Sequence, residues 1–67
     1  MIDEREIWAC AAHVMRQYGE AAAFHAAQRA DELIAASDIE GQRTWMRILA
    51  RIEALERLEP DERQMVQ

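Results

Sequence analysis

The sequence contains no lysine, and it has few residues that interrupt helices or cross-link chains. Of its 67 residues, two are glycine, one is proline and one is cysteine. A lone cysteine excludes a disulfide within the chain and is typical of proteins kept in a reducing cytoplasm. The scarcity of glycine and proline, together with thirteen alanines, favours an all-α fold over one that contains sheets.

Long apolar runs are absent as well. No stretch approaches the roughly 20 apolar residues that a transmembrane helix needs, and the acidic N-terminus lacks the features of a secretory signal. We therefore expect a cytoplasmic protein with no membrane partner.

The net charge of −5 disfavours binding to nucleic acid, because such binding depends on neutralising phosphates with Lys and Arg. The short length indicates a single domain with a thin core.

Helix start and stop signals recur along the chain. Asp3 and Glu6 predict a capping box at the first helix, and Gly19 predicts its end. Asp38 can cap the third helix, which we expect to stop before Pro60 because the residue preceding proline avoids the helical conformation. These signals predict helices over about 3–18, 20–36 and 38–58.

The predicted architecture is a compact all-α bundle of three helices. Short connections favour antiparallel neighbours, so we expect up-down-up topology over residues 1–58, with 59–67 as a flexible tail or loose turn. Trp45 lies at the centre of the apolar stripe of the third helix and is predicted to be a core residue. Gly41 in the same sector is expected to make room for a neighbouring side chain. The predicted core face of the second helix is formed by Ala23, Ala27, Ala30 and Ile34.

No residue pattern indicates catalysis or a bound metal. His13 and His25 lie six residues to either side of Gly19, which suggests a shared metal, but their helical angles turn both side chains towards solvent and away from each other. Cys10 lies at the edge of an apolar face, where a cysteine usually serves as a small hydrophobic residue. We therefore expect no catalytic residue, no metal ligand and no cofactor.

The most distinctive surface feature is a row of arginines on the outer side of the third helix. Arg47 and Arg51 have no acid three or four positions away, where ion pairs on a helix normally form. Their partners must come from another helix, from another molecule or from water. A solvated face explains the row, and so does a docking surface for an acidic partner. The predicted partner-binding set, called the arginine stripe below, is Arg43, Met46, Arg47, Arg51 and Arg57.

Three functions fit these observations. The first is a small non-enzymatic module, an adaptor or inhibitor, that binds an unidentified protein through the arginine stripe. The second is a structural homo-oligomer, in which a second copy completes the thin core. The third and weakest is a nucleic-acid binder; a helix-turn-helix needs a shorter second helix and more polar base-reading residues than this chain offers.

Tryptophan, glycine and small residues follow a distinctive order along the chain: Trp8-Ala9-Cys10-Ala11, Val14, Tyr18-Gly19, Ala22, Phe24, Ala27-Gln28-Arg29-Ala30-Asp31-Glu32-Leu33, Asp38, Gly41, Trp45, Ile48, Ile52 and Leu55. This order resembles a family of short alphaproteobacterial helical proteins of unknown function. The resemblance covers about Ile7 to Leu58. It implies a free-standing cytoplasmic helical protein and transfers no site residues.

Overall fold

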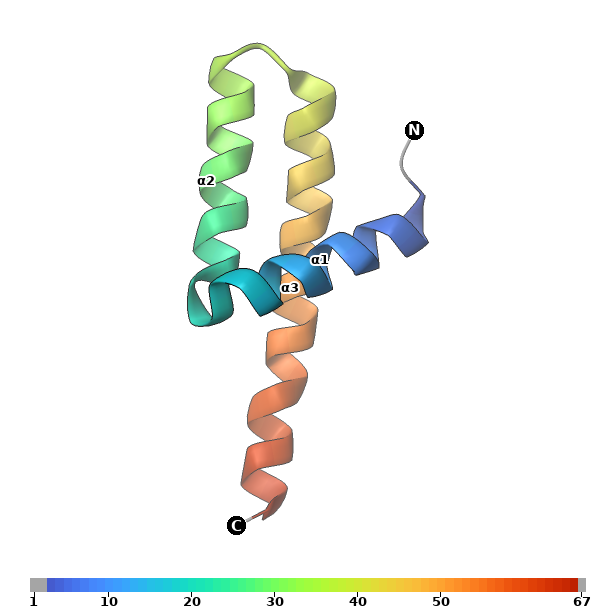
Figure 1. Cartoon of the computed structure of the whole chain (residues 1–67), viewed down its shortest axis with the longest axis vertical. Coiled ribbons are helices and arrows are strands. Elements are labelled where there is room, and N and C mark those ends of the chain that lie inside the picture. The colour runs from blue at the N-terminus through green and yellow to red at the C-terminus, as the bar shows by residue number, and fades with distance from the viewer. Residues whose placement is uncertain (1–2, 67) are drawn as a thin grey trace.

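The computed structural model describes the backbone of residues 3–66 and the side chains of residues 3–58. Over this range the fold is all-α, as predicted, and it contains no strand. Figure 1 shows the helices in their spatial arrangement. In chain order the elements are α1 (Glu4–Tyr18), the short 3₁₀ helix η1 (Gly19–Ala21), α2 (Ala22–Ala35) and α3 (Ile39–Val66).

The predicted capping box forms at the start of α1. The Asp3 carboxylate accepts a hydrogen bond from the Glu6 backbone N–H at 2.9 Å, and the Asp3 N–H donates to the Glu6 carboxylate at 3.2 Å. Two backbone donors that have no partner within the helix are satisfied in this way.

The junction between α1 and α2 is a bend without a loop. Gly19 adopts a φ of 56°, a left-handed conformation that costs glycine little, and its N–H donates to the Met15 carbonyl. η1 follows at once and leads into α2, so residues 4–35 form one bent helical path. α1 and α2 therefore meet at a corner (Figure 1).

Because of this corner, the architecture differs from the predicted one. α2 and α3 run side by side as an antiparallel hairpin, whereas α1 lies across them at a steep angle (Figure 1). The expected up-down-up bundle, with three nearly parallel axes, is not what forms. The physical reason is the joint: the non-helical Gly19 and the 3₁₀ turn that begins with it redirect the chain through a corner and do not reverse it.

The turn between α2 and α3 is tight and regular. Ser37 has a φ of 64°, its N–H donates to the Ile34 carbonyl, and the Asp38 N–H donates to the Leu33 carbonyl at 2.8 Å. This is the hydrogen-bond pattern of a Schellman motif, with serine where glycine is usual.

Asp38 then caps α3, as predicted. Its carboxylate accepts a hydrogen bond from the Gly41 N–H at 3.0 Å. A Cβ atom on Gly41 would lie 2.6 Å from that carboxylate, so the neighbour for which Gly41 makes room is the cap itself.

The core lies where α1 crosses the hairpin, and half of it is alanine. Trp45, which was predicted to be a core residue, packs against this core but is only half-buried. The α2 face is rotated from the predicted one, and Ile34 is exposed. The buried side chains are Ile7, Ala11 and Val14 of α1, Ala22, Ala26 and Ala30 of α2, and Ile48 and Ile52 of α3.

Helix α3 extends beyond its predicted end at Leu58 and continues through Pro60 to Val66, where a tail was expected. Proline disfavours a helical conformation in the preceding residue but does not forbid it, and it costs the helix one backbone hydrogen bond. The proximal half of α3, residues 39–52, packs against α2 and α1. The distal half, residues 53–66, begins with the half-buried Ala54, Leu55 and Glu56 and then extends past α1 with no other element of residues 3–66 beside it (Figure 1).

Candidate interaction surface

The arginine stripe lies on the side of α3 that faces away from the core. The side chains of Arg43, Met46, Arg47 and Arg57 are exposed, and Arg51 is half-buried. Met46 leaves 45% of its surface open to solvent. The predicted outward orientation therefore holds for Arg43, Met46 and Arg57, whereas Arg47 and Arg51 turn towards α1.

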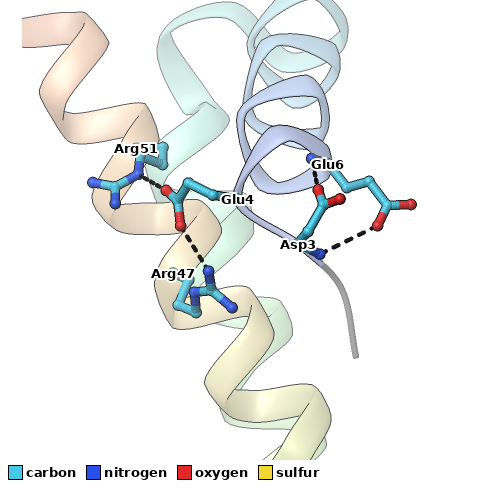
Figure 2. Close-up of polar contacts among 5 residues, drawn as sticks. All are labelled: Asp3, Glu4, Glu6, Arg47 and Arg51. Carbon is cyan, nitrogen blue, oxygen red and sulfur yellow. Dashed lines mark hydrogen bonds and ion pairs between the residues drawn. The ribbon is translucent and has the colours of Figure 1, made fainter.

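Two arginines of the stripe share one carboxylate, which comes from α1. Arg47 donates through Nη2 to Oε1 of Glu4 at 2.7 Å, and Arg51 donates through Nε to Oε2 at 2.6 Å. Figure 2 shows Glu4 turned towards α3, while the capping pair at the start of α1 lies on its other side. Each oxygen therefore receives one charge-assisted hydrogen bond, in a geometry that holds the start of α1 against α3.

The two guanidinium groups shift the titration of Glu4. Hydrogen bonds from Arg51 first and Arg47 second, together with their positive charges, lower the pKa of Glu4 from its ordinary value of 4.5. Its ionised form is thereby favoured.

A cation–π contact adds to this junction. The Arg51 guanidinium carbon lies 5.1 Å from the centre of the Trp8 ring. Because Trp8 is one turn along α1 from Glu4, both residues approach α3 from the same helix, and they hold one arginine between a carboxylate and an aromatic face. Trp8 remains 39% exposed, so this end of the junction borders solvent.

Sequence spacing could not reveal these partners. It correctly showed that Arg47 and Arg51 have no acid within α3, and one of the stated alternatives, a partner on another helix, is what the structure contains. Arg43 and Arg57 do have acids three or four positions away, at Glu40 and Glu53, but these pairs do not form among the described side chains. Of the four arginines in the stripe, these two have no ion pair in residues 3–58.

An apolar groove of about 350 Å³ opens between α1 and α3. It brings Cys10 and His13 to the same wall, three residues apart on α1, and no hydrogen bond joins them. The surface that lines the groove is almost entirely apolar. The lining residues are Ala9, Cys10, His13, Val14, Trp45 and Ile48.

The two histidines do not converge. His13 is exposed, as predicted, but His25 is half-buried and stacks on Tyr18 with ring centres 3.9 Å apart and an interplanar angle of 14°. The rings of His25 and Trp45 make an edge-on contact, with their centres 5.8 Å apart. The prediction that His25 points to solvent is wrong because the α2 face is rotated. Among the described residues, no group of three or more His, Cys, Asp or Glu side chains could hold a metal ion.

Residues 3–66 thus define a class of small all-α proteins in which a bent helix wraps across a second, longer helix. No helix in the described part of the chain is both long and apolar enough to cross a membrane. A family model, a family of unknown function called DUF6961, matches residues 3–59, and the chain belongs to that family. No curated protein and no solved structure matches the chain.

Proposed function

We propose that this chain is a non-enzymatic protein-binding module of the cytoplasm that docks on an acidic surface of a partner through the arginine stripe. One observation carries the proposal: Arg47 and Arg51 hold a single carboxylate between them, one oxygen each. The spacing of these two arginines on α3 is therefore suited to carboxylate recognition, with the chain's own Glu4 as the example.

Arg47 and Arg51 still have free N–H donors for a partner after they bind Glu4. Each guanidinium has five N–H donors, and each of these two arginines forms one hydrogen bond in the described residues. Their side chains are 43% and 37% exposed. Arg43 extends the row with no ion pair of its own among residues 3–58. Arginine is suited to this role because its planar fork matches carboxylates in two-pronged geometry.

Apolar surface accompanies the charges. Exposed Met46 lies within the stripe, and a flexible thioether adapts to varied partner surfaces. Interfaces of this kind combine an apolar patch with arginine.

The test is capture of partners from native cell extract, with Arg43→Glu as the critical variant. Arg43 is preferred to Arg47 or Arg51 because its replacement leaves the Glu4 contacts in place. Captured protein should fall several-fold, because like charges would then meet at the docking surface. The matched control is Arg16→Glu, the same charge reversal on an exposed residue of α1. Equal capture by both folded variants would assign the stripe to solvation alone.

A further inference from the structure

We propose that the acidic partner of the arginine stripe is a second copy of this chain, whose α3 runs antiparallel to the first. This inference rests on the proposed function, since it takes the stripe as the docking surface and names what docks there. Three observations support it: the surface area of the chain, the charges along α3 and the uncovered distal half.

The chain exposes more surface than a compact monomer of its mass. Its accessible surface is 5161 Å², whereas a folded monomer of 7.8 kDa is expected to expose about 4,400 Å². The excess of roughly 800 Å² equals the area that each partner buries in a protein–protein interface of standard size. The radius of gyration, 13.0 Å, also exceeds the roughly 11 Å expected for a compact domain of this length.

The two halves of α3 carry opposite charge. The proximal half contains three arginines and one acid, a net charge of +2, and the distal half contains five acids and two arginines, a net charge of −3. Parallel association would place like charges together. Antiparallel association places the basic half of each copy against the acidic half of the other, and a two-fold axis makes this contact twice.

The distal half of α3 is also accessible to a second chain. Beyond its half-buried first turn it extends past α1 with no other element of the described residues beside it (Figure 1), and Leu58 on this half leaves 60% of its surface exposed. Two copies of α3 can therefore approach each other without displacing α1 or α2 from the core. A heterologous partner would need to supply both charges in the same order, whereas a second copy supplies them by symmetry.

A charge-swap experiment with sedimentation velocity tests the proposal. The wild-type chain should sediment as a dimer as concentration rises, and added salt should weaken the dimer. Arg43→Glu by itself and Glu53→Arg by itself should each lose the dimer, because acid then meets acid or arginine meets arginine at positions that are exposed in the single chain. An equal mixture of the two variants should restore it, because each altered half then faces its opposite.

Circular dichroism of each variant shows whether it is folded. A folded wild-type chain that stays monomeric at every concentration would overturn the inference, as would a mixture of folded variants that fails to dimerise. If the wild-type chain is monomeric while Arg43→Glu still reduces partner capture, the proposed function stands and only the identity of the partner is wrong. If either variant fails to fold, Arg43→Gln and Glu53→Gln replace the reversals, and each should weaken the wild-type dimer by a smaller amount.

Discussion

The proximal and distal halves of α3 share one helix but differ in what holds them. In the proximal half, Ile48 and Ile52 are buried under α1 and α2, and Arg47 and Arg51 bind Glu4. In the distal half, Leu58 is exposed, and past Glu56 no other element of residues 3–66 lies alongside (Figure 1). The comparison indicates that the packing that stabilises the fold lies where α1 crosses the hairpin, and that the distal half contributes less to it.

The sharpest test is a matched pair of truncations on the two halves. Ile52→Ala removes a fully buried side chain and should cost about 2–5 kcal/mol, enough to abolish cooperative folding in a domain this small. Leu58→Ala removes a mostly exposed side chain and should cost roughly 0.5 kcal/mol in the monomer. Urea denaturation at low protein concentration measures both. Equal losses would show that the distal half is as well packed as the proximal half.

The turn that begins the proximal half offers a stabilising change. Ser37→Gly should raise the free energy of unfolding by roughly 0.5–1 kcal/mol, because glycine adopts the observed φ of 64° without strain. Ala36→Gly is the control, since Ala36 has an ordinary φ of −88° and glycine there should only destabilise. Thermal unfolding followed by circular dichroism distinguishes the two. Destabilisation by Ser37→Gly would show that its left-handed backbone carries no cost.

Removing the carboxylate that joins α1 to the proximal half should have a smaller effect. Glu4→Ala should lower the melting temperature by less than Ile52→Ala does, and added salt should reduce the difference from wild type because these charges are exposed. Asp31→Ala is the control, an exposed acid with no ion pair among the described side chains. An effect of Glu4→Ala no greater than that of Asp31→Ala would mean that the two hydrogen bonds add nothing to stability.

The same contact should give a small dependence on pH. Because Arg51 and Arg47 lower the pKa of Glu4 in the folded state, its contribution to stability is fully present above the ordinary value of 4.5. It is lost as the pH falls below 4.5 through the lower folded value. Urea denaturation of wild type and Glu4→Gln should therefore differ at pH 7 and converge in acid. A difference that persists in strong acid would show that the carboxylate acts through packing.

Local signals in the sequence predicted the starts of α1 and α3 and the end of α1 well, but they placed the end of α3 too early, at Leu58, and predicted the packing poorly. Asp3, Gly19 and Asp38 each act through neighbours a few residues away, and all three hold their predicted places. The predicted face of α2 is wrong because the apolar side of this helix is wide, and it includes both the predicted residues and the ones that are buried. The core face follows Ala22, Ala26 and Ala30, which only the position of α1 selects.

The arginine stripe shows the same limit. Its outward orientation follows from helical periodicity, and the absence of acids within α3 was read correctly. Glu4 reaches Arg47 and Arg51 because of the direction of α1, and the backbone at Gly19 sets that direction. Periodicity describes one helix at a time, so it could not reveal a partner on a crossing helix.

The corner at Gly19 has a consequence for the order in which the chain folds. The α2–α3 hairpin closes across a short turn, whereas the bonds from Glu4 join residues 43 and 47 positions apart. Closing so long a segment costs more chain entropy than closing a turn. We therefore expect the hairpin to form early and α1 to dock late, so the loss of Glu4 should mainly speed unfolding and leave the rate of folding almost unchanged.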